Sequence, residues 1–251
     1  MSRIMQRIVI IGASSAIAEK CARLWLRQAP ADMVLVGRNI HKIEAIAADL
    51  RIRSPESSIT CLETDFNDPL KIRALVDGIA SAARVDIVLI AHGALPQQQC
   101  CQQDLVLCRE ALDINAISPV LFAEAFAGRM EEANAGTLAV ISSVAGDRGR
   151  KSNYVYGAAK GLVTRYVQGL QHRLAGTGVK VVLIKPGPTD TPMTAQLKQQ
   201  GKALADADAV AASIVKAIRQ GRSLVYVPAR WRLIMMVIRH LPECIFKRMD
   251  I

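Results

Sequence analysis

The stretch that decides the fold is Ile8-Val9-Ile10-Ile11-Gly12-Ala13-Ser14-Ser15-Ala16-Ile17-Ala18. Its four leading apolar residues predict a buried strand, and the amphipathic pattern from Ala16 to Gln28 predicts a helix directly after it. In such a unit, backbone N–H groups and the helix N-terminus converge on one point, which favours an anionic pyrophosphate. An ordinary strand-to-helix turn is the alternative. The candidate binding positions are Gly12, Ser14, Ser15, Ala16 and Ile17.

Similar apolar runs recur along the chain, and amphipathic segments of helical length separate them. The runs are apolar throughout, as expected for strands covered by helices on both faces. We therefore predict an α/β fold, a single Rossmann-type, doubly wound parallel sheet of about seven strands with helices on both faces. The further predicted strands are Met33 to Val36, Ser58 to Leu62, Ile87 to Ala91, Leu138 to Ser142, Val179 to Ile184 and Leu224 to Val227. The further predicted helices are Ile40 to Arg51, Pro69 to Ala82, Tyr154 to Leu174 and Ala207 to Arg219.

The composition is that of one large globular domain. Of the 251 residues, 51% are hydrophobic and 22% charged, which excludes a disordered chain. No apolar run reaches the ~18 residues of a membrane span, and the run Ile8 to Ala13 is too short for a secretory signal. We expect a cytoplasmic protein with a cofactor-binding and catalytic domain at residues 1–228 and a C-terminal helical tail at 229–251.

The cysteines and the net charge restrict the ligands. Six cysteines show no CxxC and no zinc-type Cys/His spacing, so we expect reduced thiols and no metal. The formal charge of +10 suggests an anionic partner, which is a phosphorylated cofactor, a lipid surface or nucleic acid.

Arg38 lies at the end of the second predicted strand, where an NAD site carries an acidic residue. A guanidinium binds phosphate in a bidentate way and stays charged at any relevant pH, so we expect NADP(H). A solvent-facing arginine at a helix start is the alternative. Asp65, followed by Phe66, can accept a hydrogen bond from an adenine amino group. After the fourth strand, we expect close approach of backbone and cofactor at Ala91, His92 and Gly93.

The segment Gln102 to Ala133 is the longest helical stretch and contains Pro119. Because proline has no N–H, the carbonyl of Asn115, four residues earlier, lacks its usual donor. We expect a kink at Asn115 that leaves this carbonyl free for water or a ligand. The alternative is that Pro119 starts a second helix after a break.

Tyr156 and Lys160 are four residues apart on a predicted helix and so lie on one face. An ammonium beside a phenol favours phenolate, which would lower the tyrosine pKa from about 10 toward working pH. Such a phenol can give a proton to an oxygen or take one from it. Ser143, at the end of the fifth strand, can hold the same oxygen.

The order of these motifs resembles that of the short-chain dehydrogenase/reductase family over about residues 6 to 227. The resemblance rests on the Gly12 turn, Asp65, Asn115, Ser143, the Tyr156-x-x-x-Lys160 pair and Pro186-Gly187. It implies an NADP-dependent oxidoreductase with a carbonyl substrate and a homo-oligomer, dimer or tetramer.

The resemblance also implies roles for single residues. Tyr156 is the acid/base, Lys160 lowers its pKa and holds the nicotinamide ribose, Ser143 orients the carbonyl and Asn115 supports a water in the proton relay. The chain departs from the family pattern at Ala16 and Ala18, which replace glycines, and at Ala91-His92-Gly93, which replaces Asn-Ala-Gly. The stretch expected to line the nicotinamide and its phosphates contains Pro186, Gly187, Thr189 and Thr191.

The tail carries an apolar helix, Trp231 to Leu241, flanked by cations, a composition typical of segments that lie on an anionic membrane surface. A subunit-interface or core-capping helix is the alternative. One expected stripe comprises Trp231, Ile234, Met235, Ile238 and Leu241, and further apolar residues on the other side are Leu233, Met236 and Val237. The flanking cations are Arg230, Arg232, Arg239, Lys247 and Arg248.

Tails of this type resemble those of bacterial reductases that act on keto-sugars carried on a polyprenyl phosphate, such as decaprenylphosphoryl 2-keto-ribose reductase. This resemblance implies a lipid-linked carbonyl substrate and peripheral contact with the inner face of the membrane. The alternatives are a soluble 3-oxoacyl or other small carbonyl reductase, and a non-catalytic regulator that binds NADP or nucleic acid. No basic stretch with interleaved aromatic residues supports a nucleic-acid partner, so we expect none.

Overall fold

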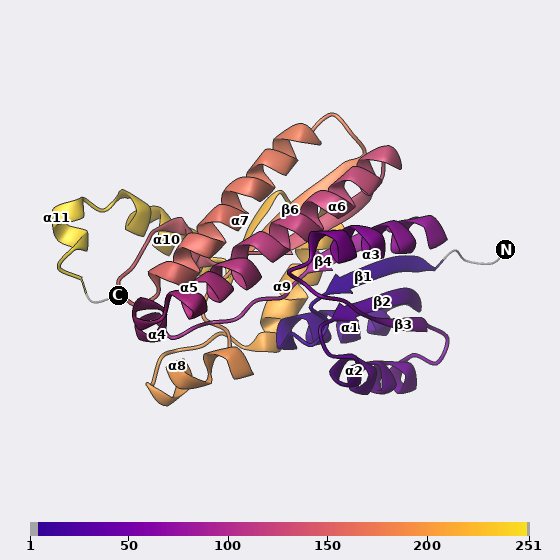
Figure 1. Ribbon diagram of the computed structural model, residues 1–251, viewed down its shortest axis with the longest axis horizontal. Coiled ribbons are helices and arrows are strands. Elements are labelled where there is room, and N and C mark those ends of the chain that lie inside the picture. The colour runs from indigo at the N-terminus through magenta and orange to yellow at the C-terminus, as the bar shows by residue number, and fades with distance from the viewer. Residues whose placement is uncertain (1–4, 250–251) are drawn as a thin grey trace.

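A computed structural model describes residues 5–249, so the outermost positions of the expected domain (1–4) and tail (250–251) lie outside the described residues. Seven parallel strands form one sheet in the order β3-β2-β1-β4-β5-β6-β7 (Figure 1). Because the order reverses between β1 and β4, loops diverge there and open a crevice at the carboxyl ends of the strands. The strands are β1 (Gln6–Ile11), β2 (Ala31–Gly37), β3 (Ser58–Glu63), β4 (Ile87–Ile90), β5 (Gly136–Ile141), β6 (Val179–Pro186) and β7 (Leu224–Val227).

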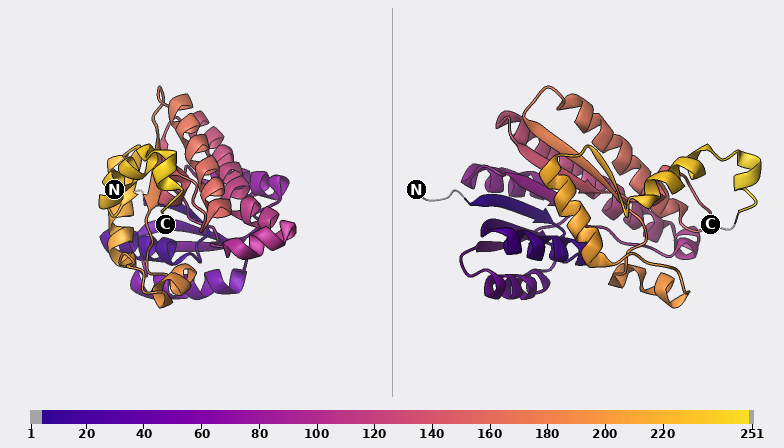
Figure 2. Two further views of the ribbon diagram at one scale, coloured as in Figure 1. Left: turned by 90° about the vertical axis from the view of Figure 1, so that its left-hand side faces the viewer. Right: turned by 180° about the vertical axis from the view of Figure 1, so that it is seen from behind.

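Helices cover both faces of the sheet. On one face lie α1, α2 and α9, and on the other α3, α6 and α7 (Figures 1 and 2). A hydrophobic core lies on each face of the sheet, and alternate residues of β1 pack into the two cores. Ile8 and Ile10 lie on the α1 side, and Val9 and Ile11 lie on the α6 side. The six helices are α1 (Ala16–Gln28), α2 (Ile40–Arg53), α3 (Pro69–Ala82), α6 (Ser118–Glu132), α7 (Tyr154–Arg173) and α9 (Ala207–Gln220).

Short elements gather at the carboxyl end of the sheet, away from the start of β1 (Figures 1 and 2). They are α4 (Gln98–Gln103), α5 (Leu105–Leu112), the 3₁₀ turns η2 (Val144–Asp147) and η3 (Pro192–Thr194), α8 (Ala195–Gln199), α10 (Arg230–His240) and α11 (Glu243–Phe246).

A π-helical turn, η1 (Asp113–Ile117), joins α5 to α6. The Ser118 N–H donates to the Asp113 carbonyl, five residues earlier, and Pro119 lies in the first turn of α6. The irregularity expected at Asn115 is therefore present, as a wide turn in a continuous helix and not as a break. The freedom of the Asn115 carbonyl stays a prediction.

The tail packs on the body through one side of α10. Trp231, Met235 and Ile238 contact Val144 and Tyr226 in a small apolar cluster. Ile234, expected in the same stripe, is 37% exposed instead, because the helix turns it away from this cluster. The other exposed apolar side chains of α10 are Leu233, Met236 and Val237. Within residues 5–249, no helix combines the length and apolarity needed to cross a membrane.

Candidate active site

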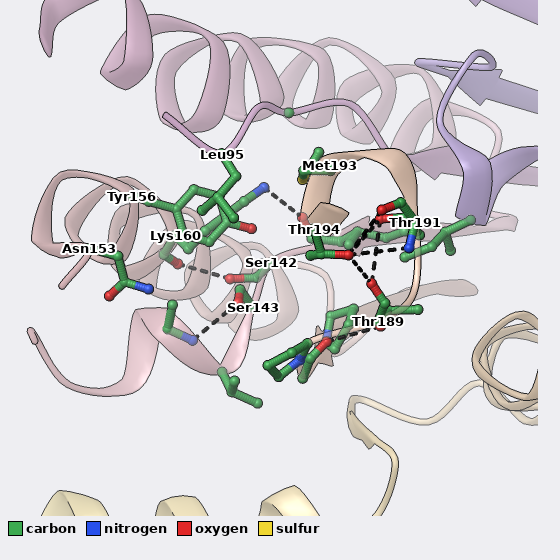
Figure 3. A pocket seen from close by; sticks show the side chains of 18 of the residues that line it. Leu95, Ser142, Ser143, Asn153, Tyr156, Lys160, Thr189, Thr191, Met193 and Thr194 are labelled. Atoms are coloured by element: carbon green, nitrogen blue, oxygen red, sulfur yellow. Dashed lines mark hydrogen bonds between the residues drawn. The ribbon is translucent and has the colours of Figure 1, made fainter. Parts of the chain in front are cut away.

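Tyr156 and Lys160 lie on the first turns of α7 and face the end of β5. Ser143 lies two residues after the end of β5 and accepts a hydrogen bond from the Ala145 N–H (3.1 Å), which begins the turn η2. Figure 3 shows the three side chains around one pocket, as the sequence predicted. The Lys160 Nζ donates to the Ile141 carbonyl at 3.2 Å and lies 5.8 Å from the centre of the Tyr156 ring.

Burial controls the protonation of this pair. It raises the pKa of Tyr156 to about 12, although a hydrogen bond with Ser143 acts in the opposite direction. The expected net lowering of the tyrosine pKa by Lys160 is therefore wrong for this structure, because burial penalises the phenolate more than its neighbours stabilise it. Burial also lowers the pKa of Lys160 to about 8. At neutral pH the phenol is protonated and able to donate.

Two hydroxyl groups outside the predicted catalytic set, those of Ser142 and Thr164, fix α7 to the sheet. Ser142 Oγ donates to the Lys160 carbonyl (2.9 Å) and lies 2.9 Å from Thr164 Oγ1. All three residues are buried. The register between Ser143 and the Tyr156-bearing turn is therefore set by a hydrogen-bonded junction, which the serine at 142, next to Ser143, could have indicated.

Asn115 is fully buried in the π turn and connects two segments. Its Oδ1 accepts from the Ala94 N–H (2.9 Å), and its Nδ2 donates to the Ala111 carbonyl (2.8 Å). The side chain thereby holds the loop after β4 against the helix. Its role toward a water stays a proposal.

The turn after β1 is packed tightly against the loop after β4. Gly12 has φ +83°, and a Cβ at this position would lie 2.6 Å from the Cβ of His92. No other residue fits here without displacing the backbone. The imidazole of His92 points into the core, where it contacts the rings of Phe66 and Phe122 and lies 2.9 Å from Ser118 Oγ. The side chains of His92 and Phe66 thus complete the core beneath the expected cofactor loop.

Ser15 and Ile17 of this turn line the Tyr156 pocket together with Ala91 and Gly93. Ser15 is the N-cap of α1, so the predicted helix start at Ala16 is confirmed.

A second, open groove lies at the ends of β2 and β3. Arg38 and Asp65 line it, and both side chains are exposed. Lys71, on the first turn of α3, lines it as well and gives it a second cation. Lys71 was not predicted as a site residue, although the helix start at Pro69 brings it to this edge.

The segment after β6 forms the opposite wall of the pocket. The Gly187 N–H donates to the Val227 carbonyl (2.8 Å), and Thr189 Oγ1 donates to the Gly187 carbonyl (3.0 Å). Thr191 opens the turn η3. Gly187 and the preceding Pro186 line the pocket beside Lys160.

The outer part of this pocket could not be predicted from the sequence. Apolar side chains from the loop after β4 and from the η3–α8 segment form it, together with polar residues that precede α7. Their pattern in the sequence is irregular, which is why no motif indicated them. These residues are Leu95, Arg150, Asn153, Met193 and Leu197.

Comparison with known proteins places this architecture in a family. The family model described as short chain dehydrogenase matches residues 6–202. The chain belongs to the short chain dehydrogenase family. It is accordingly an oxidoreductase of this type. The described part of the chain contains no group of three or more His, Cys, Asp or Glu side chains able to hold a metal ion.

Proteins similar to this short chain dehydrogenase match it over nearly their whole length. An uncharacterized oxidoreductase of Mycobacterium tuberculosis is 30% identical over 243 residues, which cover 96% of each protein. The solved short-chain dehydrogenase from Sphingobium yanoikuyae in complex with NADPH superposes with a TM-score of 0.82 at 23% identity, over 95% of this chain and 97% of that one. A short chain dehydrogenase from Burkholderia cenocepacia in complex with NADP gives 0.82 at 16% identity, over 97% of both.

Proposed function

We propose that this short chain dehydrogenase is an NADP(H)-dependent enzyme that reduces a carbonyl group at Ser143, Tyr156 and Lys160. The observation that carries the proposal is the meeting of these three side chains in one pocket, beside the Gly187 wall. Asn115 is proposed to support them through the loop that it holds.

The residues present fit the cofactor. The turn at Gly12 leads into the N-terminus of α1, whose first backbone N–H groups can meet a pyrophosphate, and Gly12 lets this turn pack directly against His92. Arg38 and Lys71 offer two cations to a 2′-phosphate. The NADPH and NADP complexes of the two similar structures support the same choice. The residues proposed to hold the cofactor are Gly12, Ser14, Ser15, Ala16, Ile17, Arg38, Asp65, Phe66, Ala91, His92, Gly93, Tyr156, Lys160, Pro186, Gly187, Thr189 and Thr191.

When bound, NADPH supplies a hydride to the carbonyl carbon. The protonated phenol of Tyr156 gives its proton to the carbonyl oxygen, and the Ser143 hydroxyl holds that oxygen by a hydrogen bond. The Lys160 ammonium stabilises the phenolate that is left, because an opposite charge nearby favours the charged form. A spectrophotometric screen for NADPH oxidation against ketones and keto-sugars tests the reaction. The absence of turnover with every carbonyl class would contradict it.

For the substrate we propose a keto-sugar on a polyprenyl phosphate carrier, with residues 229–251 docked on an anionic bilayer and residues 1–228 as the catalytic domain. The exposed apolar side chains of α10 and its flanking cations support the docking. Each cation contributes about 1 kcal/mol near such a surface before screening. A soluble carbonyl substrate, with the tail in a homo-oligomer interface, is the competing proposal.

Vesicle co-sedimentation separates these proposals. We expect the full chain to sediment with vesicles that contain phosphatidylglycerol and to be released by salt. A Leu233→Ser, Val237→Ser double variant should lose binding, since both side chains are exposed on α10. The matched control changes two exposed apolar residues far along the chain, Ile52→Ser and Leu70→Ser. Absence of binding in the full chain, with oligomers lost in the α10 variant, would favour the interface.

A further inference from the structure

Among the described residues that line the pocket, Arg150 is the one cation besides Lys160, and the proposed reaction does not use it. It lies between η2 and α7, and it lines the pocket together with Tyr156 and Ser143. Its Nε atom is buried and has no hydrogen-bond partner. Burial lowers the pKa of its guanidinium below the usual value. Because buried donors normally find an acceptor, an unpaired guanidinium nitrogen in a substrate pocket indicates a ligand that accepts from it.

The surroundings of Arg150 offer no counter-charge. Within the described residues, no Asp or Glu lines this pocket. Asn153, on the same segment, has a buried Oδ1 that is also unpaired, but a neutral amide cannot balance the guanidinium. Near Tyr156 the remaining walls are mostly apolar, with Leu95, Met193 and Leu197. The pocket therefore combines a carbonyl end, an apolar middle and one unbalanced cation.

The wall that carries Arg150 is anchored to the tail. Arg148, two residues earlier, donates to the carbonyls of Ile238 (2.6 Å) and Leu241 (2.7 Å), and its guanidinium lies 3.8 Å from the centre of the Phe246 ring. The opposite wall is anchored to the same helix, because a Cβ on Gly187 would lie 1.9 Å from Trp231 Nε1. Both sides of the pocket thus touch α10, and Arg150 lies on the side that Arg148 attaches to it.

We propose that Arg150 binds an anionic oxygen group of the substrate, a phosphate ester or a carboxylate, while Ser143 and Tyr156 hold its carbonyl oxygen. This inference rests on the proposed reductase function and names its substrate class. A guanidinium suits this role because its planar fork forms charge-assisted hydrogen bonds with both kinds of oxyanion. The anion has two sources, a phosphate on a lipid carrier and a free anionic metabolite, and the experiment separates them.

The kinetic test compares a keto acid with its methyl ester in the Arg150→Gln variant. A hydrogen bond to a charged group contributes about 1.5–3 kcal/mol, so kcat/KM for the acid should fall by about 10- to 150-fold. The value for the ester and the Kd for NADPH should not change. Arg150→Lys should keep part of the preference for the acid. Arg222→Gln removes the charge of an exposed arginine outside the pocket and is the matched control. Equal losses on acid and ester, or weakened NADPH binding, would overturn the proposal.

A binding test keeps the inference independent of turnover. The NADPH-loaded protein is titrated calorimetrically with farnesyl phosphate and with ribose 5-phosphate. Tighter binding of farnesyl phosphate indicates the lipid source, and tighter binding of ribose 5-phosphate indicates the free metabolite. Arg150→Gln should raise the Kd of the preferred ligand by about 10- to 150-fold. If neither phosphate binds the wild type more tightly than the variant, the inference fails even where carbonyl reduction is found. If no carbonyl is reduced but the wild type still binds a phosphate more tightly than Arg150→Gln does, only the proposed function fails.

Discussion

Burial favours the neutral form of both titratable side chains at the centre of the site. It raises the pKa of Tyr156 to about 12 and lowers that of Lys160 to about 8. At pH 7 the phenol therefore holds its proton firmly, while the ammonium is still mostly charged. The pair is prepared for proton donation to an oxygen, which is the direction that carbonyl reduction needs.

Replacement of Tyr156 by phenylalanine removes only the proton donor and keeps the ring. We expect turnover to fall by about 10² to 10⁴, the usual loss with a missing general acid, and NADPH binding to survive. Lys160→Ala should impair both. Steady-state kinetics and fluorescence titration with NADPH measure the two quantities. Near-normal turnover of Tyr156→Phe would exclude this mechanism.

Arg38 should decide the choice between the two nicotinamide cofactors. Arg38→Asp replaces the cation of the β2–β3 groove by a carboxylate, which repels a 2′-phosphate and accepts from ribose hydroxyls. The ratio of NADPH to NADH affinity, measured by titration, should shift toward NADH. Tighter binding of NADH than NADPH by the unaltered protein would show that Arg38 has another role. Arg109→Asp, an exposed arginine on α5, controls for the change in net charge.

At the scale of elements, the sequence predicted the strands well where their residues are apolar on both faces. The helices α1 and α3 begin and end as predicted, since Pro69 and the N-cap Asp68, which accepts from the Leu70 and Lys71 N–H groups, define the start of α3. The end of β6 was predicted too early, at Ile184. The strand continues because Lys185 and Pro186 pair with Tyr226 and Val227 of β7, and the buried Lys185 ammonium forms an ion pair with Asp147, a partner that no local pattern reveals.

The site shows the same division between local and long-range information. Residues at strand ends, such as Ser143, could be predicted because parallel strands bring their carboxyl ends together. Arg150 could not, since the pocket that it lines is completed by Met193 and Leu197 from a distant segment. The polar helix α4, Gln98–Gln103, was also missed, because its residues give no apolar periodicity.

The attachment of the tail helices depends on Arg148. Arg148→Met removes two charge-assisted hydrogen bonds to α10 and the stacking on Phe246. A local loss of about 2 kcal/mol would speed amide hydrogen exchange in α10 roughly 30-fold. Mass spectrometry of peptides from 230–246 measures this change. Arg239→Met, on the exposed side of α10, is the control, and equal exchange in both variants would mean that Arg148 does not hold the tail.

At the scale of the whole molecule, His92 couples stability to pH. Burial, Lys160 and Arg38 hold the pKa of its imidazole well below 6.5. Below about pH 6.5 the histidine is protonated in the unfolded chain but not in the native protein. This group should therefore lower the free energy of unfolding by at most about 1.4 kcal/mol for each unit by which the pH falls. Urea unfolding between about pH 7 and pH 5, which brackets the ordinary histidine pKa, measures the slope of the unfolding free energy against pH. The slope should flatten in His92→Gln and persist in His41→Gln, which changes an exposed histidine. An unchanged slope in His92→Gln would show that another group causes the pH dependence.

The contacts of α10 with both walls of the pocket have a practical consequence for handling the protein. A purification tag or fluorescent fusion joined after α11 would be attached next to the helices that contact Gly187 and Arg148, and its bulk would strain these contacts. Preparations tagged there would then report weak substrate affinity for a reason unrelated to chemistry. The start of β1, at the opposite end of the sheet (Figure 1), is the safer attachment point for assays and immobilisation.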